Sequence, residues 1–137
     1  MLMACMMALS LVACGNKTND NGGSGDSADG TGTETIKLGV VGPLTGGYAN
    51  YGLSVQHGAQ LAVDEINAAG GVNGKQLELS AQDSQGDPES AVAAYGKLMD
   101  WGMNVFLGGV LSGETASVEA AAKADDMFIM ETTGSAD

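Results

Sequence analysis

The stretch IKLGVVG, Ile36–Gly42, opens the folded part of the sequence and ends in a Gly-Pro turn. Its short, mostly apolar run predicts a β-strand. From about Gly52 to Ala69, apolar residues recur with the helical period of about 3.6 residues, which predicts an amphipathic helix. Its apolar stripe consists of Val55, Ala59, Ala62, Val63 and Ile66. The Gly-rich segment GGVNG that follows is expected to end this helix.

The alternation of strand and helix continues to the end of the chain. Further strands are predicted at residues 75–83, 105–109 and 127–131, and further helices at residues 88–102 and 113–125. Asp87-Pro88 supplies an N-cap and a first-turn proline for the second helix. The order β-α-β-α-β-α-β predicts an α/β fold with right-handed crossovers and a mostly parallel sheet.

The predicted topology also places a ligand crevice. In open sheets of this kind, ligands lie outside the carboxyl ends of the strands, where the strand order reverses direction. If the second strand lies on one side of the first and the third on the other, the crevice falls between the first and third strands. Its walls would then be residues 42–52 and residues 108–115, with residues 131–137 beside them.

The segment GGVLSGET, Gly108–Thr115, resembles a phosphate-binding loop at all positions but one. Glu114 stands where that motif has the lysine that neutralises phosphate charge, so a nucleotide would be repelled. A helix N-terminus can nevertheless bind a single carboxylate through its unpaired N–H groups, and the Ser112 hydroxyl adds a donor. The alternative is that Ser112 caps its own helix. The residues alone leave both readings open.

Composition excludes several classes of function. The 137 residues carry a net charge of −12 with five lysines and no arginine, which argues against nucleic acid as a partner.

His57, the only histidine, lies off the apolar stripe of its helix and is expected to be solvated. The segment DSQGDPE, Asp83–Glu89, has the composition of a calcium loop but the wrong spacing, and is expected to be a turn with a helix cap. The sequence therefore predicts neither an enzyme nor a cofactor or metal site.

The first 35 residues differ from the rest. Residues 1–13 are apolar or small and too short to span a membrane, which suits an export signal. The run Leu11-Val12-Ala13-Cys14-Gly15 resembles the lipobox of bacterial lipoproteins, in which the cysteine is lipidated and becomes the first mature residue. Residues 14–35 are thus predicted to be a lipidated cysteine and a flexible tether, because the Gly-, Ser- and Asp-rich segment after Cys14 cannot form a core. Residues 36–137 are left for a single domain.

The folded part closely resembles the start of leucine/isoleucine/valine-binding proteins, the type I periplasmic solute-binding subunits of branched-chain amino acid ABC transporters. The resemblance rests on IKLGVVGPLTGGYANYG and above all on GAQLAVDEINAAGGVNGK. It implies that residues 36–137 are an incomplete amino-terminal, Rossmann-like lobe of a two-lobed clamshell. The resemblance further implies an extracytoplasmic protein, held on the membrane by its lipid, that binds a free amino acid and delivers it to permease subunits.

Residue roles follow from the same resemblance. Ser112 matches the serine that binds the ligand α-carboxylate, and Thr133 and Ser135 match contacts to the α-carboxylate and α-ammonium groups. Tyr51 matches an aromatic residue of the side-chain pocket.

Departures and alternatives remain. Glu114 and Glu131 place acid near the site, where the family has neutral residues, which could favour an amide or a polyamine-like solute. The chain stops at Asp137, inside a binding loop, and is therefore interpreted as a fragment of a longer protein. Two other interpretations of the chain are a ligand-sensing receptor domain of the same fold and a non-functional truncated remnant.

Overall fold

The computed structural model describes residues 34–133, which belong to one compact unit, Thr31–Asp137. Its elements are β1 (Ile36–Gly42), α1 (Ala49–Ala68), β2 (Leu77–Asp83), α2 (Pro88–Asp100), β3 (Val105–Leu107), α3 (Ser112–Ala124) and β4 (Ile129–Met130). The predicted order of strands and helices is confirmed. The largest change at a helix start is in α1, which begins at Ala49 instead of Gly52, with Tyr48 as its N-cap residue.

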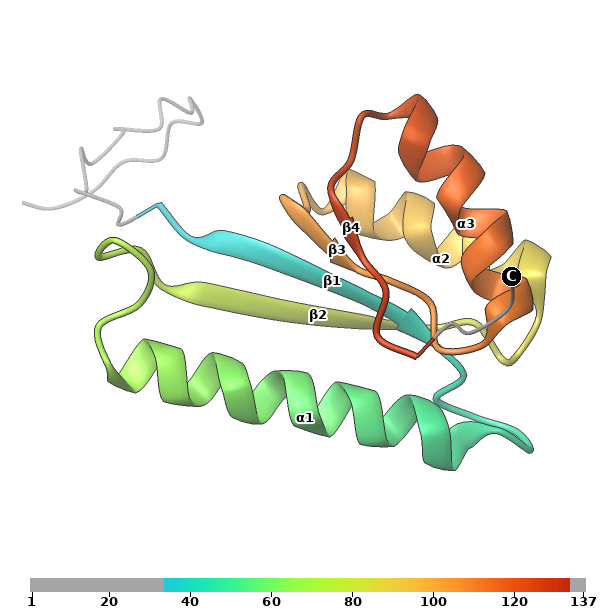
Figure 1. Ribbon diagram of the computed structural model, residues 1–137, viewed down its shortest axis with the longest axis horizontal. Helices are drawn as coiled ribbons and strands as arrows, with labels where there is room; N and C mark the ends of the chain where they lie inside the picture. Colours follow the sequence, from blue (N-terminus) through green and yellow to red (C-terminus); the bar gives the residue numbers. More distant parts are fainter. Residues whose placement is uncertain (1–33, 134–137) are drawn as a thin grey trace, which may run out of the picture. The chain divides into compact units, whose positions relative to one another are not determined.

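The described strands form one parallel sheet in the order β2-β1-β3-β4. β1 pairs with β2 over its full length, from Ile36 opposite Leu77 to Gly42 opposite Asp83. On its other edge β1 pairs with β3. The second and third strands thus lie on opposite sides of the first, which is the condition on which the expected crevice depended. All four carboxyl ends point toward the right-hand side of Figure 1.

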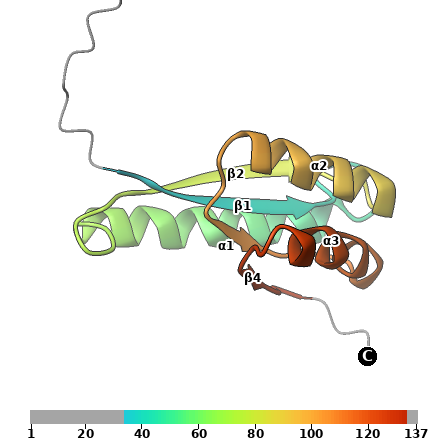
Figure 2. The same cartoon turned by 90° about the horizontal axis from the view of Figure 1, so that it is seen from above.

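The helices cover the two faces of the sheet unequally. α1 packs along β1 and β2 on one face, whereas α2 and α3 lie side by side on the other (Figures 1 and 2). The predicted inner stripe of α1 is correspondingly only partly confirmed, because Val63 is buried, Val55 and Ala59 are half-buried, and Ala62 and Ile66 are exposed. The physical reason is that a helix resting on two strands buries a narrower strip than the 3.6-residue pattern marks.

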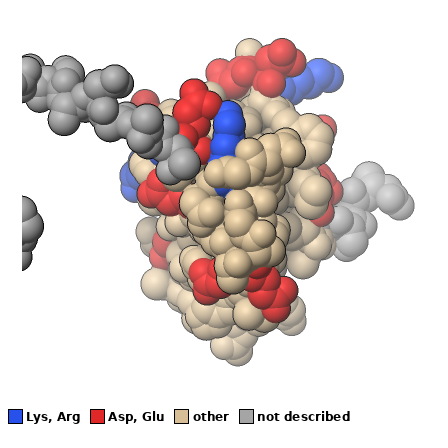
Figure 3. Space-filling view, turned by 90° about the vertical axis from the view of Figure 1, so that its left-hand side faces the viewer, with Lys and Arg blue, Asp and Glu red and all other residues tan. Residues whose placement is uncertain are grey.

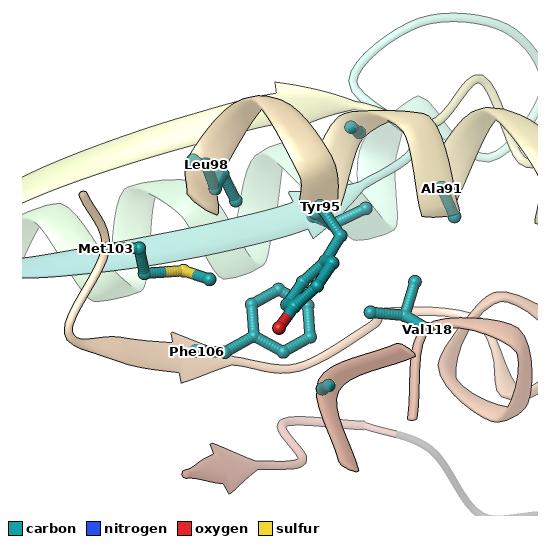
Figure 4. Packing of buried hydrophobic residues seen from close by; sticks show 9 residues of the cluster. Ala91, Tyr95, Leu98, Met103, Phe106 and Val118 are labelled. Carbon is teal, nitrogen blue, oxygen red and sulfur yellow. The ribbon is translucent and has the colours of Figure 1, made fainter. Parts of the chain in front are cut away.

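The main core lies between the sheet and the pair α2 and α3 (Figure 4). The rings of Tyr95 and Phe106 meet edge to face at 5.4 Å between centroids, a favourable geometry for aromatic pairs. Leu98, Met103 and Val118 pack around them. Burial, together with a hydrogen bond to the Asp125 carboxylate, raises the pKa of Tyr95 to about 12, so its hydroxyl stays protonated.

Asp87 begins α2 as predicted. Its carboxylate accepts a hydrogen bond of 2.8 Å from the backbone N–H of Ser90, and Pro88 occupies the first helical turn. Hydrogen bonds from Ser90 hold the pKa of Asp87 below its usual value. The segment Asp83–Glu89 is thus a turn with a helix cap, as the spacing predicted. Within residues 34–133, no group of three or more His, Cys, Asp or Glu residues is arranged to hold a metal ion.

Acidic side chains are spread over the surface at the amino ends of the strands, with lysines among them (Figure 3). His57 is exposed on α1, as expected. Among the helices of the described region, none has the length and apolar character needed to cross a membrane.

Candidate functional site

A pocket of about 430 Å³ lies at the carboxyl ends of the strands. It is lined by Tyr48, Tyr51, Val110, Leu111, Ser112 and Thr133. Tyr48 and Tyr51 come from the start of α1, Val110, Leu111 and Ser112 come from the end of the loop after β3 and the first residue of α3, and Thr133 comes from the segment after β4. The walls are therefore the ones that the sequence analysis expected, and the pocket lies where the strand order reverses.

Three of the four predicted ligand contacts meet in this pocket, namely Tyr51, Ser112 and Thr133. Ser135, the fourth, lies outside the described residues. The sequence analysis missed Tyr48, which lies three positions before Tyr51 in the same wall. An aromatic residue at the start of a helix, one turn from another aromatic, is the signal that could have found it. The two tyrosines are 55% and 64% exposed, so the pocket is open to solvent.

The first turn of α3 faces the pocket. The N-cap residue is Leu111, which gives no side-chain cap hydrogen bond, and the helix itself begins at Ser112. The alternative in which Ser112 is the N-cap of its helix is therefore wrong, because that position belongs to Leu111. A helix N-terminus in contact with a pocket offers N–H groups and a partial positive charge to an anion.

Glu114 does not line the pocket. Its side chain is 1% exposed, accepts a hydrogen bond of 2.6 Å from the Ser84 hydroxyl, and accepts a longer one of 3.4 Å from the backbone N–H of Leu111. The idea that Glu114 selects a cationic or amide solute thus loses its basis, since the carboxyl is engaged beneath the helix start. Glu131 is exposed and does not line the pocket either.

Thr133 has a defined hydrogen-bond role. Its hydroxyl donates to the backbone carbonyl of Val110 at 2.6 Å. Because the hydroxyl proton is used, the oxygen presents acceptor lone pairs to any further partner. This arrangement suits a donor such as an ammonium group better than a carboxylate.

Asp83, at the end of β2, accepts hydrogen bonds from the loop between β1 and α1, which leads to Tyr48 and Tyr51. Its carboxylate accepts hydrogen bonds from the Thr45 hydroxyl at 2.6 Å and from three backbone N–H groups, those of Leu44 at 2.8 Å, Thr45 at 3.3 Å and Gln85 at 2.8 Å. Desolvation by itself would raise the pKa of Asp83. The hydrogen bonds to the charged form outweigh it and hold the pKa below its usual value.

Acid is expected to weaken the hydrogen bonds that the Asp83 carboxylate accepts. Because the pKa of Asp83 is lower in the folded than in the unfolded protein, its stabilisation is fully present above about pH 4 and is lost as the pH falls through the folded-state pKa. Melting temperatures measured from about pH 6 to about pH 3 should therefore fall less steeply for Asp83→Asn than for the unmodified chain. Equal slopes would show that Asp83 carries no proton-linked stability.

Comparisons with known proteins agree with this architecture. A family model described as periplasmic binding protein matches residues 35–137. The Leu/Ile/Val-binding protein BraC3 of Rhizobium johnstonii is 37% identical over 101 residues, which cover 74% of this chain and 28% of the relative.

Solved structures give the same picture. The branched-chain amino acid transporter substrate binding protein LivJ of Streptococcus pneumoniae, in complex with isoleucine, has a TM-score of 0.73 and 36% identity, covering 76% of this chain and 30% of that one. A fatty acid ABC transporter substrate-binding protein of Thermomonospora curvata has a TM-score of 0.65 and 35% identity, covering 70% and 24%.

This chain thus spans under a third of the length of the relatives that it matches. All three relatives are named as binding proteins and none as an enzyme, in agreement with the sequence-based expectation. With the family model matched from Thr35 to Asp137 and the fold shared with these relatives, the chain belongs to the periplasmic binding protein family.

Proposed function

We propose that residues 36–137 form one lobe of an extracytoplasmic solute-binding protein that serves an ABC transporter and binds a branched-chain or related amino acid. The observation that carries the proposal is the pocket itself, where a helix N-terminus, an acceptor hydroxyl and two tyrosines converge at the carboxyl edge of a parallel sheet. The names of the relatives support the same class of ligand.

Each part of an amino acid has a matching partner in this pocket. The α-carboxylate would lie at the N-terminus of α3, near the Ser112 hydroxyl, where dipole and N–H groups favour an anion. The α-ammonium group would donate to Thr133, whose hydroxyl proton is held by Val110. Ser135 is proposed to share these contacts. The apolar side chain would pack against Tyr51, Tyr48 and Leu111.

Ser112→Ala tests the carboxylate site in a two-lobed protein, in which this lobe is joined to the second lobe that the resemblance implies. The change removes a donor to a charged group in a closed cleft, so the binding free energy should weaken by about 1.5–3 kcal/mol, which is about 10- to 150-fold in affinity. The loss of affinity should exceed the loss of stability, because Leu111 and not Ser112 is the N-cap residue of α3. The dissociation constant by calorimetry and a thermal melt measure the two effects. A destabilised protein with unchanged affinity would move the carboxylate site elsewhere.

A fatty acid is the second candidate ligand, favoured by the relative from Thermomonospora curvata. It shares the carboxylate of an amino acid but lacks the ammonium group. The acceptor role of Thr133 argues for the amino acid, because a fatty acid has no donor to satisfy it. Calorimetry with leucine and with 4-methylpentanoate, which differs from leucine only in lacking the amino group, separates the two classes.

We further propose that residues 1–13 are an export signal and that Cys14 carries the lipid that anchors residues 15–35 as a tether. These residues lie outside the described part of the chain, and the proposal rests on the segment Leu11–Gly15. Incorporation of labelled fatty acid in a bacterial host should be abolished by Cys14→Ala. Cys5→Ala is the matched control, because Cys5 would leave with the signal, and it should not reduce labelling. Equal labelling of the Cys14→Ala protein and the unmodified protein would show that Cys14 does not carry the lipid.

A further inference from the structure

The turn at the carboxyl end of β2, residues 83–86, contacts both walls of the pocket, namely residues 42–52 and residues 108–115. None of its residues lines the pocket. The turn is fixed to β1, because the backbone N–H of Ser84 donates to the carbonyl of Gly42 at 2.9 Å. It therefore connects the sheet to the loop between β1 and α1 and, through Glu114, to the start of α3.

Asp83 holds the first wall. Its hydrogen bonds to Leu44 and Thr45 fix the chain where it leaves β1. From there Gly46 and Gly47 lead directly to Tyr48. A side chain added at Gly47 would touch nothing within 4 Å, and one at Gly46 would only reach the Gln85 carbonyl at 4.0 Å. Hydrogen bonds therefore direct this loop toward Tyr48, those to Asp83 before the glycines and one of 3.3 Å from the Ala49 N–H to the Gly46 carbonyl after them.

Ser84 holds the second wall through Glu114. Ser84 is fully buried and its hydroxyl donates to one oxygen of the Glu114 carboxyl, while the other oxygen accepts from the Leu111 N–H. The N-terminus of α3 is thereby tied to the end of β2 by two hydrogen bonds in sequence, the first buried and the second partly buried. Buried polar links of this kind fix geometry, because breaking one leaves a group without its partner in a poorly solvated place.

Gly86 shows how closely the turn approaches both walls. A Cβ atom added there would lie 3.4 Å from the Tyr48 ring and 3.8 Å from the Leu111 side chain. Gly86 also has a φ of +79°, a conformation that side chains rarely adopt. The turn thus lies against one residue of each wall, so that a shift of the turn would reach both.

We propose that Asp83 and Ser84 are positioning residues that set the spacing of the two pocket walls, and with it the affinity for the ligand, without touching the ligand. The proposal rests on the proposed function of the pocket. Asp83 acts through the wall of Tyr48 and Tyr51, and Ser84 acts through Glu114 on the wall of Leu111 and Ser112.

Single substitutions in the two-lobed protein test the proposal, with leucine as the probe. Asp83→Ala and Ser84→Ala should each weaken leucine binding by about 5- to 10-fold, as expected for coupled neighbours. Asp83→Asn should restore most of the affinity at neutral pH, because its amide oxygen still accepts from the Leu44 N–H. Gln85→Ala is the matched control in the same turn, since its exposed side chain reaches neither wall, and it should leave affinity unchanged.

Double-mutant cycles separate positioning from a general loss of stability. The effect of Asp83→Ala should shrink when Tyr48→Ala is already present, and the effect of Ser84→Ala should shrink when Ser112→Ala is present. The crossed pair, Asp83→Ala with Ser112→Ala, should be additive. Glu114→Gln replaces Ser84→Ala if the latter does not fold, because an amide cannot accept both hydrogen bonds that the carboxylate accepts.

The outcomes distinguish this proposal from the proposed function. If Ser112→Ala weakens binding while Asp83→Ala and Ser84→Ala do not, the ligand site is supported and the positioning role of Asp83 and Ser84 is contradicted. Additivity in the two matched cycles would also overturn it. If Ser112→Ala and Tyr51→Ala leave leucine binding unchanged, the pocket itself is wrong.

Discussion

Gly52→Ala is expected to destabilise the lobe by about 3 kcal/mol, the upper end of the usual cost of overpacking. A Cβ atom on Gly52 would lie 2.1 Å from the carbonyl oxygen and 2.6 Å from the carbonyl carbon of Pro43. Both are backbone atoms that cannot rotate away. Either α1 or the end of β1 must therefore move.

Gly58→Ala is the matched control in the same helix. A Cβ atom there would meet nothing within 4 Å, and the residue is exposed. Alanine is the better helix former, so this change should stabilise the lobe by up to about 1 kcal/mol. Urea unfolding of both variants measures the difference between them, about 4 kcal/mol. Similar stabilities for the two variants would mean that Gly52 does not lie against Pro43.

The position of Gly52 also matters for ligand binding. It directly follows Tyr51 and fixes how closely the start of α1 approaches the end of β1. A Cβ atom at position 52 would push the start of α1 away from Pro43. Tyr48 and Tyr51 would then move away from residues 108–115 on the other side of the pocket. Close approach of backbone to backbone is thus one of the contacts that shape the pocket.

The sequence predicted the fold well because its signals are local. The run Ile36–Gly42 and the cap Asp87-Pro88 mark their elements through nearest neighbours in the chain, and the structure places them as expected. Topology rules placed the crevice only on the condition that the strand order reverses at the first strand, and the structure meets that condition.

Contacts between distant segments were not predictable in the same way. The sequence analysis placed Glu114 near the ligand because the sequence shows only its position in the loop. Its hydrogen-bond partner Ser84 lies 30 positions away in the chain. Asp83 reads as part of a turn, yet its hydrogen bonds reach 39 positions back to Leu44. Such pairings depend on how three loops meet at one edge of the sheet, which no local pattern encodes.

The lobe alone, residues 36–137, is expected to bind leucine about 100-fold more weakly than a complete Leu/Ile/Val-binding protein. Full burial of a leucine side chain contributes about 1.5–3 kcal/mol, and a charge-assisted hydrogen bond contributes about as much again in a dry site. One wall supplies neither in full, because Tyr48 and Tyr51 are 55% and 64% exposed and the pocket is open to water. The two contributions sum to about 3–6 kcal/mol, and at about 1.4 kcal/mol for each factor of ten a loss of about 2.8 kcal/mol from this sum corresponds to the expected 100-fold.

Calorimetry of the lobe and of a Leu/Ile/Val-binding protein under the same conditions measures this difference. Any residual binding should still be local, so amide shifts in a leucine titration should concentrate at Ser112 and Tyr51 and disappear in Ser112→Ala. Leucine affinity equal to that of the Leu/Ile/Val-binding protein would show that residues 36–137 suffice for binding. Shifts spread evenly over the lobe would instead indicate non-specific association, because a ligand held by the α3 N-terminus must perturb that wall first.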